Sequence, residues 1–287
     1  MTLETPAAAR TLSRGLAPIV EALELQQEHL VTTATLEGLA RQAGLSTPAR
    51  VLAARLRKSG WLLPTARRGV YEFAPGSHAG ALSRGDVTLP LQAALHGIAE
   101  PVAGLTLQSA AWALGAADRA PSRLEVAAAD AKTQRRLHLV LGDRARVVPF
   151  APNLPWERHR GVPVLSADSV LVHVAARPND VRSWDSALDW LTELAADATF
   201  DRLADELTGR PRSVTVRLAY LLSGLRPDVT EALDLMPSSP LRRKPPGSTQ
   251  PKVYFGPRGR LLRHDARRQV ADTTLPFDPR RLPQVRS

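Results

Sequence analysis

The feature that most constrains the fold is the order of elements that residues 12–73 predict, which is three helices followed by a hairpin. Apolar residues recur at helical spacing in the first segment, at Leu12, Leu16, Ile19, Leu23 and Leu25. A second helix is expected between a threonine cap at residues 32–33 and a stop at Gly44. A third is expected from Pro48 to about Ser59, with the capping residue in Ser46-Thr47 and Pro48 at the first helical position. This order is typical of a winged helix-turn-helix domain.

The third helix is predicted to present a basic face to solvent. At about 100° per residue, Leu52 and Leu56 lie on the side that packs inward. Arg50 and Arg57 lie seven residues apart on the opposite side. The other residues expected beside them are Ala53, Ala54 and Lys58. Because arginine binds a guanine edge through two hydrogen bonds and alanine leaves room for the helix, such a face suits the major groove of DNA.

A hairpin with a basic tip is expected directly after this helix. Strands at residues 61–63 and 70–73 flank a loop that contains Arg67 and Arg68. Such a wing would contact phosphates or the minor groove. Exposed arginines also occur on solvated helix faces, hairpin tips are often charged, and winged helices can mediate protein contacts instead. The two basic elements together favour double-stranded DNA, with candidate contacts at Ser46, Thr47, Arg50, Arg57, Lys58, Arg67 and Arg68.

The net charge also favours an anionic partner. The chain has 38 Lys and Arg side chains against 28 Asp and Glu, a formal charge of +10. Residues 237–287 hold 12 basic and 3 acidic side chains, so most of the excess lies there. Such a surplus suits nucleic acid or an anionic membrane surface. A solvated, arginine-rich extension that only aids solubility is the alternative.

Stretches rich in proline, glycine and serine divide the chain into three predicted segments. We expect a winged helix-turn-helix domain over residues 1–76, a larger α+β domain over 77–236, and a basic extension over 237–287 that docks in part on the second domain. The second domain is expected to be mixed α+β with a helical second half. Its strands are expected at residues 124–126, 137–140 and 145–150, and its helices after caps at Ser166 and Ser183.

Two further expectations concern the end of the chain. A helix that starts near Val214 would place Arg217 and Tyr220 in a surface patch. In the basic extension, residues 253–255, 261–262 and 270–271 are apolar enough to form strands or to dock on the domain.

The residue pattern does not predict catalysis. Cysteine is absent, which excludes disulfides, thiolate zinc sites and cysteine nucleophiles. No zinc-protease, phosphate-loop or nucleophile-elbow motif occurs. Asp185 and Asp189 lie one helical turn apart, but such pairs are common on solvated helix faces, and the neighbouring tryptophans are expected to be structural. His173 lies in an apolar run and is expected in the core. We therefore expect no enzyme activity, no cofactor and no metal.

Two observations bear on location. No apolar run reaches the ~18 residues of a membrane-spanning helix. The amino terminus lacks the basic start and apolar run of a secretory signal. A cytoplasmic protein without a membrane partner is expected.

Several stretches of the sequence resemble one protein family. They are RKSGWLLP at 57–64, RGVYEFAPG at 68–76, LQSAAWALG at 107–115, VLSADSVLVHVAARP at 164–178 and YFGP at 254–257. Taken together, they are similar to the AbiEi-type antitoxins of type IV toxin–antitoxin systems, the abortive-infection AbiE family. The resemblance covers most of the chain in order and spacing.

The resemblance implies a two-domain antitoxin that is not an enzyme. Its winged helix would repress its own operon by binding upstream repeats, with the family's DNA contacts at Arg50, Arg57, Lys58, Arg67 and Arg68. Its carboxy-terminal domain would support cooperative DNA occupancy and counteract a nucleotidyltransferase-like toxin, with or without direct contact, in phage defence. Candidate contacts for a polyanion or the toxin in the extension are Arg242, Arg243, Lys244, Lys252, Arg258 and Arg260.

Two other functions remain open at this point. One is a stand-alone transcriptional regulator whose second domain senses a ligand. The other is an interaction module that neutralises a partner by direct contact, which is compatible with DNA binding by the first domain.

Overall fold

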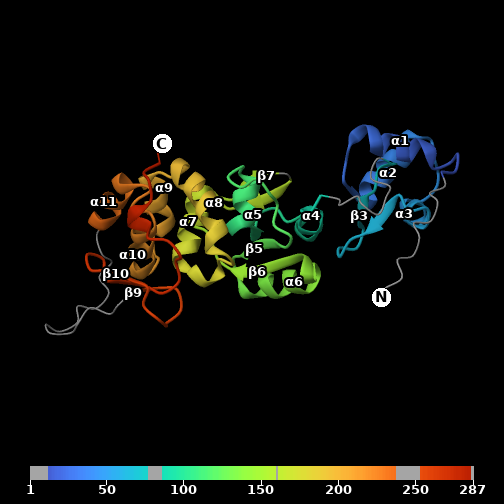
Figure 1. Ribbon diagram of the computed structural model, residues 1–287. Helices are drawn as coiled ribbons and strands as arrows, with labels where there is room; N and C mark the ends of the chain where they lie inside the picture. The colour runs from blue at the N-terminus through green and yellow to red at the C-terminus, as the bar shows by residue number, and fades with distance from the viewer. Residues whose placement is uncertain (1–11, 77–85, 160, 237–252, 286–287) are drawn as a thin grey trace. The chain divides into compact units, whose positions relative to one another are not determined.

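The computed structural model describes residues 12–76, 86–159, 161–236 and 253–285, which together form eleven α-helices and three small β-sheets (Figure 1). The class is mixed α+β, as the sequence predicts. Contacts between residues divide the chain into two compact units. The first contains residues 1–99 with 139–141, and the second contains residues 100–138 with 142–287.

The first unit alternates short helices with the strands of one antiparallel sheet. Its elements are α1 (Ala17–Gln26), β1 (Leu30–Thr32), α2 (Thr33–Gln42), α3 (Ala49–Lys58), β2 (Leu62–Pro64), β3 (Val70–Phe73) and α4 (Leu89–Leu95). The strand order is β1-β3-β2, so the β2–β3 hairpin is completed by a strand that lies before α2. This arrangement is consistent with a winged helix. Strand β1 and helix α4 are not foreseen from the sequence pattern; α4 packs on β1 and β3.

The core of the first unit is built from one stripe on each of its first three helices. Ile19 and Leu23 of α1 are fully buried together with Leu36 of α2 and Leu56 of α3. Burial of a side chain of this size contributes about 1.5–3 kcal/mol. The expected stripe of α1 was too wide, because its outermost members are exposed, at 45% for Leu12 and 79% for Leu25.

The expected cap of α2 is confirmed. The Oγ1 atom of Thr32 accepts a hydrogen bond from the backbone N–H of Thr35 at 3.0 Å. This satisfies one of the amide groups that the first turn of a helix leaves without a backbone partner.

The second unit begins with a five-stranded mixed sheet. Its strands are β4 (Ala103–Leu105), β5 (Leu124–Ala128), β6 (Ala145–Pro149), β7 (Glu157–His159) and β8 (Val162–Val164), in the order β6-β5-β4-β8-β7. The helices α5 (Leu107–Ala113) and α6 (Ala131–Leu141) connect its first three strands. The pairs β5–β6 and β4–β8 are parallel, and the other two pairs are antiparallel.

The strand expected at residues 137–140 is wrong, because this segment is the second half of α6. The side chain of Asp130 caps the helix by accepting from Thr133 N at 2.8 Å. Leu137 and Leu141, four residues apart, are buried, while Leu139 is 83% exposed. This is the burial pattern of an amphipathic helix.

The expected helical part of this unit contains five helices in the described residues, of which the last, α11, is not foreseen from the sequence. They are α7 (Ala167–Ala176), α8 (Trp184–Asp197), α9 (Phe200–Leu207), α10 (Arg212–Leu221) and α11 (Pro227–Leu235). The expected caps are confirmed, since Ser166 accepts from Ser169 N and Ser183 accepts from Ser186 N. Short 3₁₀ turns occur at Gly142–Arg144, Pro178–Asp180 and Pro279–Arg281.

The end of the chain forms a separate three-stranded sheet that packs on α10 (Figure 1). Its strands are β9 (Val253–Phe255), β10 (Arg263–Asp265) and β11 (Val270–Asp272), in the order β10-β11-β9. The strands expected at 253–255 and 270–271 are therefore confirmed. The segment 261–262 is not a strand, and it lies in the exposed connection between β9 and β10.

Two contacts fasten this sheet to α10. Arg217 Nε donates to the carbonyl of Tyr254 at 2.6 Å, and the hydroxyl of Tyr220 donates to Asp272 at 3.1 Å. Tyr220 is fully buried, so the expected surface patch with Arg217 is wrong. The β10-β11-β9 sheet thus covers the face of α10 that carries Tyr220, which the sequence pattern had indicated to be exposed.

Candidate nucleic-acid interface

Helix α3 presents the basic face that its periodicity predicts. Leu52 and Leu56 are 1% and 0% exposed and belong to the core of the first unit. The outward positions that the sequence analysis named and that are exposed are Arg50, Ala54, Arg57 and Lys58. Within the described part of the chain, none of the three cations forms an ion pair. Their charge is therefore free to meet an external anion.

One alanine was assigned to the wrong side of this helix. Ala53 is 2% exposed and is part of the core cluster. It lies three residues before Leu56, which at about 100° per residue places it only about 60° from the buried centre. Ala54, in contrast, is exposed between Arg50 and Arg57.

Two further residues of α3 belong to this surface although the sequence pattern does not single them out. Arg55 and Val51 are both exposed on α3, on the flank of the face that carries Arg50. Arg55, Arg57 and Lys58 occupy the last turn of the helix. Cations at this end interact favourably with the helix dipole, so these residues also stabilise α3 in the absence of any ligand.

Ser46 and Thr47 do not cap α3 as expected. The helix begins at Ala49, Pro48 occupies the N-cap position, and no side chain donates or accepts a capping hydrogen bond there. Pro48 has an extended backbone conformation and its side chain offers no capping group. Its backbone carbonyl accepts hydrogen bonds from the N–H groups of Val51 and Leu52. Ser46 is exposed and Thr47 is half-buried just before the helix.

The β2–β3 hairpin has a basic tip, and side-chain hydrogen bonds hold its turn. Thr65 organises the turn, since its hydroxyl donates to the carbonyl of Val70 at 2.8 Å and accepts from the N–H of Arg67 at 3.2 Å. The carbonyl of Gly69 accepts hydrogen bonds from the hydroxyl and the N–H of Thr33, which ties the turn to the start of α2. Arg68 is exposed at the tip, and Arg67 is half-buried.

The second unit contains further candidate contacts. Arg242, Arg243, Lys244 and Lys252 lie outside the described residues. Arg258 and Arg260 are exposed in the connection between β9 and β10. The Arg258 guanidinium lies 5.8 Å from the centre of the Tyr254 ring. The other described arginines of this region form ion pairs with aspartates, namely Arg263, Arg267, Arg268, Arg280 and Arg281. Of the described arginines after residue 252, only Arg258 and Arg260 lack an ion pair.

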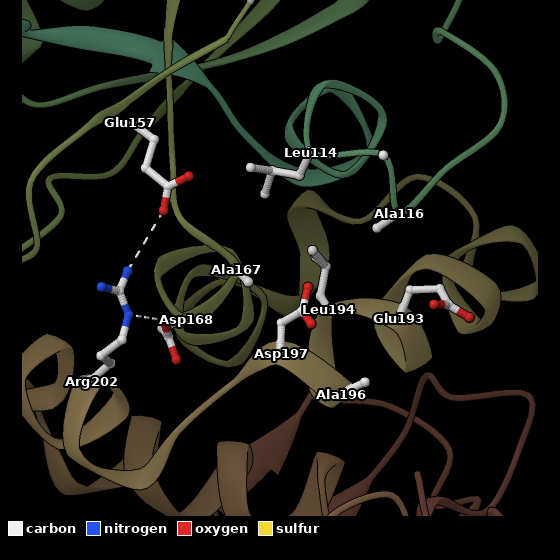
Figure 2. A pocket seen from close by; sticks show the side chains of 11 residues that line it. Leu114, Ala116, Glu157, Ala167, Asp168, Glu193, Leu194, Ala196, Asp197 and Arg202 are labelled. Atoms are coloured by element: carbon white, nitrogen blue, oxygen red, sulfur yellow. Dashed lines mark hydrogen bonds and ion pairs between the residues drawn. The ribbon is translucent and has the colours of Figure 1, made fainter. Parts of the chain in front are cut away.

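A polar pocket of about 330 Å³ lies in the second unit, between α7, α8, α9 and β7 (Figure 2). Four carboxylates line it, those of Glu157, Asp168, Glu193 and Asp197, together with Arg202. Arg202 Nε donates to Asp168 at 2.6 Å, and its Nη2 atom lies 3.7 Å from Glu157. This pairing raises the pKa of Arg202. The pocket remains acidic, because Glu193 and Asp197 form no ion pair with any residue that the structure describes.

Two buried networks hold the elements around this pocket. The Glu206 carboxylate is fully buried and accepts from the N–H groups of Asn153 and Leu154, from the hydroxyl of Ser169 and from the guanidinium of Arg210. His173 is also fully buried, with Nδ1 at 2.6 Å from the hydroxyl of Thr106. Burial lowers the pKa of His173, so the imidazole stays neutral. The expectation that His173 is a core residue is therefore confirmed.

Glu125 is the carboxyl group whose ionisation the fold disfavours most clearly. It is buried in β5, and burial raises its pKa from 4.5 to about 6. Its hydrogen bond from Gln108 N at 3.0 Å and the guanidinium of Arg146 at 3.5 Å oppose this shift. Both partners stabilise the ionised form.

The expected structural role of the tryptophans on α8 is confirmed. Trp184 and Trp190 are buried, whereas Asp185 and Asp189 are exposed. Among the residues that the structure describes, no group of three or more His, Cys, Asp or Glu side chains is placed to hold a metal ion. In the same parts of the chain, no helix has the length and apolarity needed to cross a membrane.

Comparison with known proteins agrees with this architecture. No curated protein matches the chain significantly. A crystal structure of the RV2827C protein from Mycobacterium tuberculosis is similar in fold, with a TM-score of 0.71 and 27% sequence identity, over 93% of this chain and 94% of that chain. The model of the AbiEi antitoxin C-terminal domain matches residues 102–224, which contain the motifs at 107–115 and 164–178. Residues 102–224 are therefore an AbiEi antitoxin C-terminal domain.

Proposed function

We propose that this protein is an autoregulatory antitoxin that represses its own operon and counteracts a nucleotidyltransferase-like toxin. In this proposal residues 1–76 bind upstream DNA repeats, residues 77–236 carry the antitoxin activity, and residues 237–287 form a basic extension of the second domain. The observation that carries the DNA-binding part is the exposed face of α3, whose cations no described carboxylate neutralises.

The residues of the first unit have distinct roles in this proposal. Arg50 and Arg57 contact base edges in the major groove, because they lie within about 20° of each other around the helix and the small, exposed Ala54 lies beside them. Lys58 and the wing residues Arg67 and Arg68 contact phosphates, which positions the helix without selecting a sequence. Ser46 and Thr47 lie just before the helix and add short polar contacts to the backbone of the DNA.

The antitoxin part of the proposal is supported by the family of residues 102–224. The neutralised toxin is a nucleotidyltransferase-like protein, and the setting is the cytoplasm, with phage defence as the physiological role. In the extension, the exposed Arg258 and Arg260 contact a polyanion or the toxin. The same role is proposed for Arg242, Arg243, Lys244 and Lys252, which lie outside the described residues. The family membership supports a protein without catalytic activity of its own.

DNA binding is tested by fluorescence-anisotropy titration of the full chain with the duplex upstream of its own gene and with a scrambled duplex. We expect the native site to bind at least about 10³-fold more tightly. Arg50→Ala with Arg57→Ala should remove most of this preference, since each bidentate arginine–guanine contact is worth about 1–3 kcal/mol. The matched control is Arg119→Ala with Arg144→Ala, which removes two exposed arginines from the second unit.

The outcomes distinguish a sequence-reading repressor from a generic polyanion surface. Loss of preference in the α3 variant alone supports a sequence-reading repressor. Equal binding of both duplexes by the wild-type protein contradicts it and indicates a generic polyanion surface.

The antitoxin role is tested by co-expression with the toxin. The variant that no longer binds DNA should still rescue growth, because antitoxicity is assigned to the second unit. Loss of rescue by that variant contradicts this division of roles.

A further inference from the structure

The connection between β9 and β10, residues 257–262, is basic and apolar at the same time. It presents Arg258 and Arg260, which form no ion pair among the described residues, and directly after them Leu261 and Leu262. These two leucines are 50% and 48% exposed. Isolated apolar side chains on a surface need no explanation, but two in sequence beside two free cations form a surface that suits a complementary protein.

This loop is held in place by its surroundings. Gly256 has a φ of +104°, and a Cβ at this position would lie 2.7 Å from Thr274 Cβ, so glycine is required for the close approach. The hydroxyl of Thr273 donates to the carbonyl of Pro257 at 2.7 Å, and Leu262 N donates to the carbonyl of Asp272 at 2.8 Å. A loop fixed in this way loses little conformational freedom when it binds, which favours association.

The acidic pocket of Figure 2 has a charge opposite to that of the 257–262 loop. Like the loop, it combines charged and apolar side chains. Glu193 and Asp197 lie one turn apart at the C-terminal end of α8, which has no basic residue in its last turn. Carboxylates in this position repel each other and the negative end of the helix dipole, so a cation there would stabilise the helix. The apolar part of the lining is formed by Leu114, Ala116, Ala167, Leu194 and Ala196.

Arg202 leaves this acidic site open. Its guanidinium is already engaged by Asp168 and lies near Glu157, while Glu193 and Asp197 line the pocket beyond it (Figure 2). Arg202 therefore neutralises only the side of the pocket that carries Asp168 and Glu157. Glu193 and Asp197 form no ion pair with any described residue.

We propose that the 257–262 loop of one copy of this chain docks into the acidic pocket of a second copy. Arg258 and Arg260 pair with Glu193 and Asp197, and Leu261 and Leu262 pack on the apolar walls. Both surfaces belong to the second unit, where no described contact joins them, so the pairing is between copies. The contact does not require DNA and does not depend on the proposed DNA-binding role.

Sedimentation velocity of the full chain over a range of concentrations tests this contact through charge reversal. The loop variant is Arg258→Glu with Arg260→Glu, and the pocket variant is Glu193→Arg with Asp197→Arg. Each alone should weaken self-association at least about tenfold, because like charges then face each other. A mixture of the two variants should associate again, since the acidic loop of one fits the basic pocket of the other. Added salt should weaken the wild-type association.

The control is Asp185→Arg with Asp189→Arg, which makes the same charge change on exposed positions of α8 that do not line the pocket. It should associate as the wild type does, and thermal unfolding of each variant should be unchanged. A wild-type protein that stays monomeric at all concentrations overturns the proposal. So does a mixture that fails to associate although both variants are folded, or a loop variant that loses only non-specific DNA affinity, which would make the loop a polyanion contact.

Discussion

The hydroxyl of Tyr220 donates a hydrogen bond to the carboxylate of Asp272 at 3.1 Å, across a span of 52 residues. This bond joins α10 of the helical half to the last strand of the terminal sheet. Asp272 is fully buried and also accepts from Arg263 Nη1 and from the N–H groups of Thr274 and Leu275. The basic end of the chain is therefore part of the packed second unit where the structure describes it.

Replacing Tyr220 by phenylalanine should weaken this connection without abolishing it. Asp272 keeps three of its four donors, so we expect the free energy of unfolding to fall by about 1 kcal/mol. Urea denaturation followed by circular dichroism measures this change. Tyr254→Phe serves as the control, because the half-buried Tyr254 hydroxyl makes no hydrogen bond in the described structure. Equal effects of the two substitutions would mean that the Tyr220–Asp272 bond contributes nothing.

The neighbouring alanines of α3 should respond in opposite ways to the same substitution. Ala53→Arg forces a charged side chain into the core and should lower the free energy of unfolding by at least about 2 kcal/mol. Ala54→Arg lies on the exposed face and should change it by no more than about 0.5 kcal/mol. Thermal unfolding of both variants distinguishes these outcomes. In DNA titrations Ala54→Arg should alter affinity, because the added side chain occupies the space that alanine leaves at the groove.

The wing and the helix should differ in how their loss affects DNA binding. Arg68→Ala should weaken native and scrambled duplexes equally and reduce the slope of log affinity against log salt by about 0.9, the value for one phosphate contact. Arg50→Ala should instead reduce the preference for the native duplex by about 1–3 kcal/mol. Titrations at three or more salt concentrations provide both quantities. A sequence-selective loss for Arg68→Ala would reassign the tip of the wing to base recognition.

Glu125 should make the stability of the protein depend on pH between about 4.5 and 6. Its pKa is raised to about 6 by burial, so the folded protein holds this proton more tightly than the unfolded chain does. The stabilisation is complete below the unfolded pKa of 4.5 and is lost as pH rises through 6. The difference amounts to about 2 kcal/mol. Urea denaturation of wild type and Glu125→Gln from pH 4.5 to 7.5 should show that the variant lacks this decline. Parallel curves for the two proteins would contradict the assignment.

Local chemistry explains the elements that were predicted correctly. Thr32, Ser166 and Ser183 each accept a hydrogen bond at the start of a helix, and this interaction spans only three residues. The inward position of Leu52 and Leu56 follows from helical spacing and from the need to bury large apolar side chains. Cap chemistry and periodicity are properties of a short stretch of chain, so the sequence by itself determined these elements and the basic face of α3.

The features that were missed depend on contacts between distant residues. The segment 137–140 is apolar enough for a strand, but the cap at Asp130 and the burial of Leu137 and Leu141 make it helical. Strand β1 exists because β3, about forty residues later, pairs with it. The placement of Tyr220 in the core depends on the terminal sheet that covers α10.

The tertiary structure also decided which charges are free. The sequence shows seven arginines between residues 253 and 285 without distinguishing them. Folding brings Asp234, Asp265, Asp272 and Asp278 to five of these arginines. Arg258 and Arg260, in the exposed β9–β10 connection, form no ion pair with any carboxylate that the structure describes. Sequence periodicity thus determined where the chain can present cations, and only the three-dimensional proximity of carboxylates decided which of them stay available for a partner.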